Sequence, residues 1–262
     1  MSAVTASGDV FNVYVTPKVP ISMSAQQITG IVNTSAGLTV NGQLVPSVPI
    51  KEGLKNLTSW LEQYPDVTLV AHNGRKFDFP VLMTSLVKTE LVDKFMSTVV
   101  ALVDSLSVFR KLHPKLESHK QEDLARILLK ETYPAHDAVQ DVIALQKLIR
   151  NEELSTRQLL TFTFPPAAVY NQWLFNKEKL KNIESLSVLL YNGVMKAPTA
   201  ENVAGSGLNL ACLRTIFRRN GEDGLSNTFT GKNKEGQPRV TSCKRTLETV
   251  IPKLVEFFQH QQ

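Results

Sequence analysis

The sequence predicts an α/β domain followed by an all-α region. Over residues 1–154, short β-branched and apolar segments alternate with segments of helical periodicity, which is typical of a layered α/β sheet. After residue 154 the apolar residues follow helical spacing, with Gly- and Pro-containing links between them. The chain has 262 residues, 42% of them hydrophobic and 20% charged, so it can bury a sizeable core. We therefore expect two domains, residues 1–154 and 155–262.

The expected strands are residues 10–15, 67–71 and 98–103. The first is β-branched and aromatic and ends before Pro17, and the other two are continuous apolar runs of the kind that is buried on both faces. The first expected helix, residues 23–28, has Ser22 as its N-cap and Gly30 after its end. Further helices are expected at residues 50–64, 79–87, 91–95, 121–130 and 138–149.

Composition excludes several classes of protein. The two cysteines, Cys212 and Cys243, are too few for a disulfide framework and fit a reducing compartment, in the nucleus, the cytoplasm or both. The first residues do not resemble a signal peptide, and no apolar run approaches the ~18 residues that a membrane helix needs. We therefore expect neither secretion nor a membrane partner.

Positive charge is concentrated in the C-terminal region. Residues 1–154 hold 15 Lys and Arg against 16 Asp and Glu, whereas residues 155–262 hold 14 against 8. Arg214, Arg218 and Arg219 share one predicted helix with a buried apolar side. This pattern is compatible with a nucleic-acid contact, a protein partner or an ordinary solvated face.

Two segments carry candidate functional residues. A polar loop follows the strand at 67–71, at the type of edge where α/β sheets bind ligands, and it leads to Asp78 before a predicted helix. Further along, His136 and Asp141 lie off the buried stripe of the helix at 138–149. Taken singly, Asp78 could be a helix cap, and His136 and Asp141 could be ordinary surface residues.

Taken together, the two segments resemble the second and third motifs of the DEDDh family of 3′–5′ exonucleases, and look closest to its three-prime repair exonuclease branch. The second motif, roughly His-Asn-x-x-x-Phe-Asp-x-x-x-Leu, is matched by His72, Asn73, Phe77, Asp78 and Leu82. The third, a His followed five residues later by an Asp, is matched by His136 and Asp141. The helical region is similar in arrangement to the exonuclease-like C-terminal region of the promyelocytic leukaemia protein and its fish relatives.

The resemblance implies a ribonuclease-H-like sheet and hydrolysis of terminal phosphodiester bonds at DNA or RNA 3′ ends with two Mg²⁺ or Mn²⁺ ions. It implies that Asp78 and Asp141 are metal ligands, roughly 4 to 7 Å apart. His136 would be the general base, a role suited to a pKa near about 6.5. Asn73 and Phe77 would shape the pocket for the terminal nucleotides.

The family's first motif, Asp-x-Glu on the first strand, is not found. Asp9 is the single acidic residue among the first 50. Two carboxylates in place of four neutralise two divalent cations poorly, so we expect little activity from the chain as printed. Losing a central strand would leave backbone groups unpaired, so we also expect that an N-terminal segment is missing from the printed chain and that the sheet shows a vacancy.

Two functional hypotheses follow. The leading one is a 3′–5′ exonuclease domain that acts on DNA or RNA ends once the missing motif is supplied. The alternative is a catalytically inactive exonuclease-fold protein that binds nucleic acid or protein as a scaffold. Under either hypothesis, Arg214, Arg218 and Arg219 are candidate nucleic-acid contacts, and the helical region is a candidate surface for protein partners.

Overall fold

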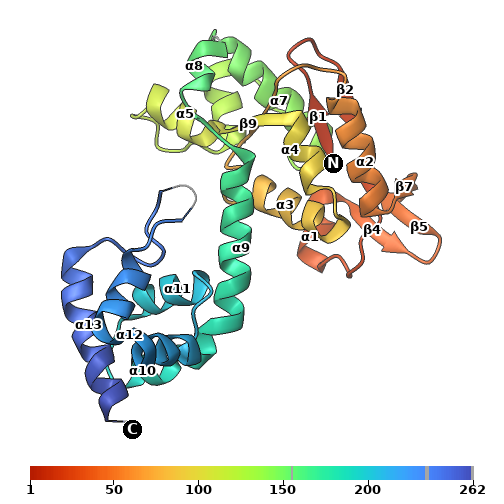
Figure 1. The fold of residues 1–262 in the computed structure, drawn as a ribbon. Coiled ribbons are helices and arrows are strands. Elements are labelled where there is room, and N and C mark those ends of the chain that lie inside the picture. The colour runs from red at the N-terminus through yellow and green to blue at the C-terminus, as the bar shows by residue number, and fades with distance from the viewer. Residues whose placement is uncertain (155, 234–235, 261–262) are drawn as a thin grey trace. The chain divides into compact units, whose positions relative to one another are not determined.

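The computed structural model describes residues 1–154, 156–233 and 236–260 (Figure 1). It divides into two compact units, Met1–Val169 and Tyr170–Gln262. This division falls later than the boundary after residue 154 that the sequence suggested. The difference arises because residues 163–164 form a strand that pairs within the N-terminal unit.

The N-terminal unit mixes strands and helices. Its strands are β1 (Ser2–Val4), β2 (Val10–Asn12), β3 (Tyr14–Val15), β4 (Ile31–Thr34), β5 (Gly37–Val40), β6 (Gln43–Leu44), β7 (Ser47–Val48), β8 (Val67–Ala71), β9 (Val99–Asp104) and β10 (Thr163–Phe164). Its helices are α1 (Met23–Thr29), α2 (Ile50–Leu61), α3 (Asp78–Thr89), α4 (Val92–Thr98), α5 (Ser105–Leu112), α6 (Gln121–Leu124), the π-helical turn η1 (Ala125–Leu129), α7 (Ala138–Asn151) and α8 (Thr156–Leu160).

The sheet that positions the site has the order β10-β9-β8. β8 and β9 are the two buried strands that the sequence predicted, and they pair in parallel with α3 and α4 in the connection between them. β10 pairs antiparallel with the other edge of β9, with Thr163 opposite Val103 and Phe164 opposite Leu102. The expectation of no strand after residue 154 was therefore wrong, because a two-residue strand leaves no periodic pattern in the sequence.

The prediction of one continuous strand at residues 10–15 was also wrong, and no part of this segment joins the sheet of β8, β9 and β10. It is split into β2, which pairs antiparallel with β1, and β3, which pairs in parallel with β7. The split occurs at Val13, whose carbonyl accepts from the Met1 ammonium group at 2.7 Å and whose N–H donates to the Met1 carbonyl at 2.9 Å. Within the described residues no strand pairs with the second edge of β8.

Local signals gave the first helix correctly. The Ser22 hydroxyl accepts from the Ala25 N–H at 3.3 Å and caps α1. Gly30 ends the helix with a left-handed φ of 66° and donates its N–H to the Gln26 carbonyl at 2.8 Å. The hairpins of β4, β5 and β6 follow, paired in that order.

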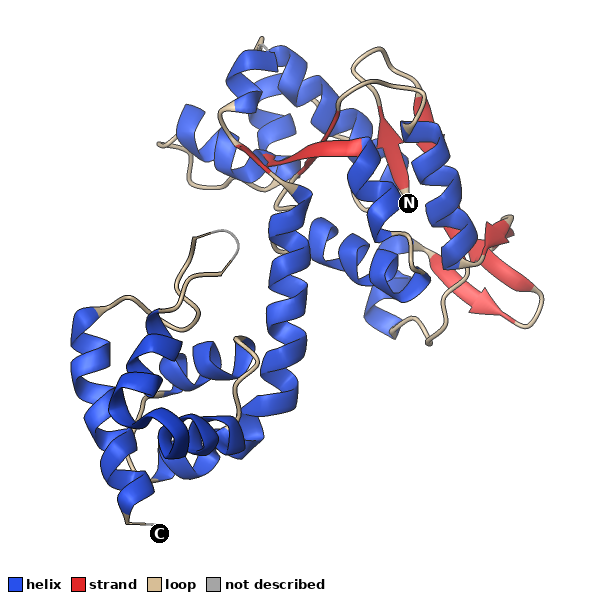
Figure 2. Ribbon diagram, viewed as in Figure 1, coloured by secondary structure: helices blue, strands red, loops and turns tan. Residues whose placement is uncertain are grey.

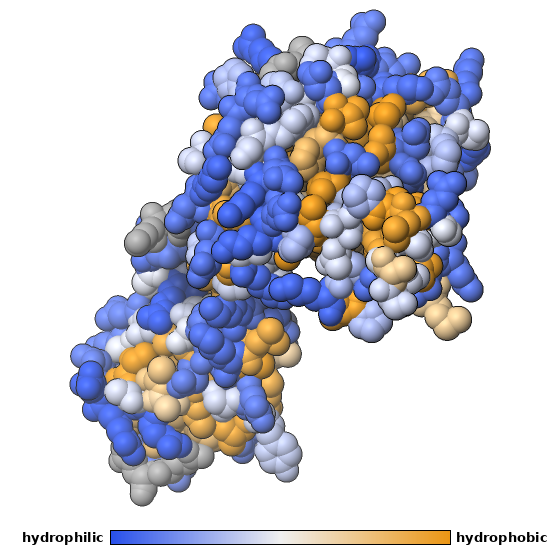
Figure 3. Space-filling view, turned by 90° about the vertical axis from the view of Figure 1, so that its right-hand side faces the viewer, coloured by the Kyte–Doolittle hydropathy of each residue, from blue (hydrophilic) through white to orange (hydrophobic). Residues whose placement is uncertain are grey.

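Helices supply most of the buried surface of the N-terminal unit. Leu54 of α2, Leu86 of α3 and Phe95 of α4 are fully or almost fully buried. A second cluster joins Phe109, Leu124, Leu145 and Leu148 from α5, α6 and α7. The small sheets cover less apolar surface, since Val10 of β2 and Leu44 of β6 are exposed. Apolar patches lie between polar residues on the face drawn in Figure 3.

The C-terminal unit is helical in its described residues, as Figure 2 shows by its lack of strands there. Its elements are α9 (Pro166–Asn182), which begins in the N-terminal unit, the 3₁₀ turn η2 (Ile183–Leu186), α10 (Ser187–Tyr191), α11 (Ala197–Gly205), α12 (Leu210–Thr230) and α13 (Lys244–Gln259). Leu189, Val203, Leu213, Phe229 and Leu254 form its centre. None of the described helices is both long and apolar enough to cross a membrane.

The separate core of the C-terminal unit gives a stability prediction. Leu254 is fully buried, so Leu254→Ala should lower the free energy of unfolding of this unit by about 2–5 kcal/mol. Leu180→Ala is the matched control, since Leu180 is 77% exposed and its loss should cost within about 0.5 kcal/mol. Native-state hydrogen exchange would measure both changes in α13. Equal effects of the two substitutions would contradict the assigned core.

Candidate functional site

The loop of residues 72–77 leaves the carboxyl end of β8 and enters α3 at Asp78. His72 anchors it: its Nε2 atom lies 2.8 Å from the His119 carbonyl and its Nδ1 atom 2.9 Å from the Ser105 hydroxyl. Because a carbonyl only accepts, Nε2 carries the proton and Nδ1 accepts from Ser105. Burial lowers the pKa of His72, which favours this neutral ring.

Asp104, at the end of β9, fixes the other side of the loop. Its buried carboxylate accepts from the Leu106 N–H at 3.0 Å, capping α5, and from the Arg75 N–H at 3.3 Å. The loop also needs Gly74, because a Cβ there would stand 2.6 Å from the Phe79 ring. Asn73 adopts a left-handed backbone with φ of 59°. The loop is therefore held by β9, α5 and the segment at His119.

Phe77 and Asp78 lie at the surface end of this loop. The Phe77 ring is 62% exposed, although it is a large apolar side chain. Loss of hydration raises the pKa of the Asp78 carboxyl group. The hydrogen bond from its own backbone N–H opposes this rise. The nearby Asp104 carboxylate adds to the rise, and His72 opposes it. Asp78 is itself exposed, so the ring and the carboxyl group are both open to a ligand.

The second group of candidate residues lies at the start of α7. Asp137 is the N-cap of this helix, and its carboxylate accepts from the N–H groups of Val139 and Gln140, both at 3.0 Å. His136 precedes it with a left-handed φ of 68° and an exposed ring. The Nε2 atom of His136 is 3.7 Å from a Glu122 carboxylate oxygen.

Asp141 is in the first turn of α7 and is held by several donors. Burial raises the pKa of its carboxyl group, while hydrogen bonds from the Tyr133 hydroxyl and the His136 N–H oppose the rise. Burial and the nearby Asp141 raise the pKa of Tyr133 to about 12. Gln121 donates to the Tyr133 oxygen at 3.0 Å and to the Asp141 carbonyl at 2.7 Å, and so ties α6 to α7.

The structure brings His136 and Asp141 together, and it places Asn73 and Phe77 with Asp78 in a second group. Across the described residues, no three His, Cys, Asp or Glu side chains form a group that could hold a metal ion. These residues therefore do not fit a pair of Mg²⁺ or Mn²⁺ ions, which need more carboxylate ligands than the two groups supply.

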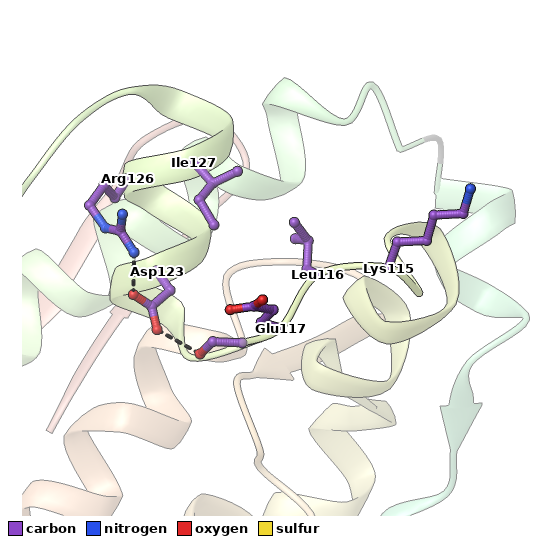
Figure 4. Close-up of a pocket in the computed structure, with 7 residues that line it drawn as sticks. Lys115, Leu116, Glu117, Asp123, Arg126 and Ile127 are labelled. Atoms are coloured by element: carbon purple, nitrogen blue, oxygen red, sulfur yellow. Dashed lines mark hydrogen bonds and ion pairs between the residues drawn. The ribbon is translucent and has the colours of Figure 1, made fainter.

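A shallow pocket of about 430 Å³ lies elsewhere in the N-terminal unit (Figure 4). Its lining residues are Lys115, Leu116, Glu117, Ser118, Asp123, Arg126 and Ile127. Asp123 accepts from the Ser118 hydroxyl at 2.6 Å and pairs with Arg126 at 2.8 Å, so these polar groups already satisfy one another. None of the residues that the sequence singled out lines this pocket.

The predicted arginines of the C-terminal region lie on α12. Arg218 and Arg219 are exposed, and Arg214 is half-buried. Leu213 on the same helix is fully buried in the core of the unit. Two of the three arginines can therefore reach a partner without rearrangement.

Sequence reasoning missed Arg75, Asp104, Tyr133, Asp137 and Phe164 as contributors to these groups. Asp137 was detectable, because Asp three residues before Gln140 at the start of a helix is a capping pattern. The roles of the others depend on partners that lie far away in the sequence.

A helix-covered α/β sheet with polar side chains at the carboxyl end of a strand is characteristic of α/β enzymes. Residues 2–149 match the model of the exonuclease (RNase_T) family, and this match spans more than half of the chain, which therefore belongs to this exonuclease family. Its N-terminal domain is accordingly of the ribonuclease-H-like type. Residues 182–261 match the model of the PML C-terminal domain. The predicted resemblances to an exonuclease family and to the C-terminal region of the promyelocytic leukaemia protein are thus confirmed.

One curated relative is a DNA polymerase III of PolC type from Caldanaerobacter subterraneus. It is 27% identical to the chain over 140 residues, which is 53% of this chain and 9% of the relative. The chain therefore spans about a tenth of the length of that protein.

The anchoring of His72 gives a pH prediction. His72→Gln removes two hydrogen bonds to partly buried groups, and should cost about 1–3 kcal/mol of stability at pH 7. Because the folded-state pKa of His72 is lowered, the unfolded state binds more protons below about pH 6.5, and the stabilisation is lost as the pH falls. The difference between wild type and variant should therefore shrink between pH 7 and pH 5.

Urea unfolding at the two pH values would measure this difference. His260→Gln, at an exposed position after α13, is the control and should change little at either pH. A gap between wild type and His72→Gln that stays constant with pH would contradict a neutral, anchored His72.

Proposed function

We propose that the chain recognises the 3′ ends of DNA or RNA through its exonuclease-family domain. The observation that carries the proposal is the position of Asn73, Phe77 and Asp78 in the loop at the carboxyl end of β8, within a domain of this family. The exposed Phe77 ring would stack on a terminal base, since stacking on aromatic side chains suits any base. The Asn73 amide would donate to or accept from the adjacent nucleotide.

Hydrolysis is a conditional part of the proposal. Asp78 and Asp141 are the carboxylates that this chain offers to a divalent cation, and His136 is the group that would take a proton from the attacking water. The ring of His136 is exposed at the N-terminus of α7, where a water molecule can reach it. We infer that cleavage requires further carboxylates, as an Asp-x-Glu strand would supply, because two cannot neutralise a pair of ions.

A non-catalytic scaffold is the second candidate. Two observations favour it: no metal-holding group of three side chains exists in the described residues, and the C-terminal region matches the PML C-terminal domain. In this case the same loop would bind nucleic acid without cutting it, and the helical unit would contact protein partners. The expected location, nucleus or cytoplasm, stays a prediction for both candidates.

Activity assays separate the two candidates. With a 5′-labelled single strand and Mg²⁺ or Mn²⁺, the chain as printed should bind but release few 3′ nucleotides. A version extended by an Asp-x-Glu strand should cleave, and His136→Ala in that version should lower the rate by about 10²–10⁴-fold. Efficient cleavage by the printed chain that survives Asp141→Ala would show that the ligand assignment is wrong. No cleavage by the extended version would favour the scaffold.

The basic helix α12 gives a separate binding prediction. If Arg218 and Arg219 contact phosphates, changing both to Ala should weaken single-strand binding and reduce the slope of log affinity against log salt by about 1.4, or ~0.7 for each contact. Thermal stability should stay within about 0.5 kcal/mol, because both side chains are exposed. Fluorescence anisotropy at several salt concentrations would measure this slope. Unaltered binding would assign α12 to structure or protein contacts.

A further inference from the structure

A cation is held against an aromatic ring beside the proposed 3′-end site. The guanidinium carbon of Arg75 lies 3.5 Å from the centre of the Phe164 ring, within the range of a close cation–π contact. Arg75 belongs to the loop of residues 72–77, three positions before Asp78. Phe164 belongs to β10, in a stretch outside the ranges that the two family models match.

Packing and hydrogen bonds hold both Phe164 and the backbone of Arg75 in place. Phe164 is buried, pairs with Leu102 of β9 and meets the edge of the Phe79 ring at 5.8 Å. The backbone of Arg75 is tied to the Asp104 carboxylate. The guanidinium plane is thus preorganised on a rigid base, so that little side-chain entropy is lost when its N–H groups bind a ligand.

The charge of Arg75 is not neutralised within the described part of the protein. The side chain is exposed, and no acidic side chain there lies within ion-pair distance of its guanidinium group. Lys76 and Phe77 follow it, both exposed. Phe162, two positions before Phe164, makes a similar contact: the Lys111 ammonium lies 5.1 Å from the centre of its ring.

The geometry points to a phosphate-binding position at Arg75, with Phe164 as the residue that positions it. This inference rests on the proposed function: the ligand is a backbone phosphate of a nucleic-acid strand whose terminal base stacks on Phe77. Arg75 binds the phosphate through the N–H groups at the edge of its plane, while its face stays on the Phe164 ring. The short strand β10 thereby extends the binding site beyond the exonuclease-family domain.

The full chain can be tested with a labelled single-stranded oligonucleotide bearing a 3′ hydroxyl, in EDTA so that no cleavage occurs. Arg75→Ala should weaken binding about 5- to 20-fold and reduce the salt slope by about 0.7. Arg75→Lys keeps the charge but loses the planar fork, and should restore the slope but only part of the affinity. Phe164→Leu keeps an apolar core residue and removes the ring, and should weaken binding with the charge intact.

Arg126→Ala is the matched control, because Arg126 is exposed in the same unit but already paired with Asp123. The Arg126→Ala variant should bind the oligonucleotide with the same affinity as wild type. As a readout that does not depend on folding of the Phe164 variant, the NMR signal of the Arg75 Nε–H should shift on addition of the oligonucleotide. It should shift less with inorganic phosphate at the same phosphate concentration, which separates a strand from a free anion.

Two outcomes would overturn the inference, and they differ from each other. If wild type binds but Arg75→Ala matches Arg126→Ala in affinity and slope, Arg75 only covers the Phe164 ring and the proposed function stands. If wild type shows no affinity for the strand at low salt, the proposed 3′-end recognition fails and the inference fails with it.

Discussion

The arrangement of the candidate site depends on one buried carboxylate, Asp104. It ends β9, caps α5 and accepts from the backbone of Arg75, so that one side chain ties the sheet, a helix and the loop after β8 together. Such a group is expensive to bury unless it is fully hydrogen-bonded, and here its partners are backbone N–H groups whose positions the fold dictates. Asn73, Phe77 and Asp78 keep their places because this loop has few ways to move.

Elements with local signals could be predicted from the sequence. The apolar runs at β8 and β9, and the Ser22 and Gly30 ends of α1, are properties of neighbouring residues. The interruption at Val13 could not be predicted, because it comes from pairing of β2 with β1 and of β3 with β7. β10 could not be predicted for the same reason, because its two residues form a strand only by pairing with the edge of β9.

In the candidate site, too, local sequence patterns could be predicted and long-range contacts could not. The motif spacing predicted Asp78, His136 and Asp141, and the structure places His136 beside Asp141 at the start of α7. The contacts that support the two groups join distant residues, such as His72 with His119, 47 positions apart. Motif spacing carries no information on partners so far apart in the chain, so these supporting contacts could not be predicted.

Two of the residues assigned to nucleotide binding or proton transfer occupy backbone conformations that glycine would adopt at lower cost. Asn73 and His136 have φ values of 59° and 68°. A left-handed conformation costs an ordinary L-residue roughly 1–2 kcal/mol, less for Asn and His than for branched side chains. Glycine at either position would relieve this strain, but it would also make the unfolded chain more flexible, and the two effects on stability are of similar size. Replacing Asn73 or His136 by glycine would therefore remove the amide or the imidazole that the proposed function uses, with little net gain in stability.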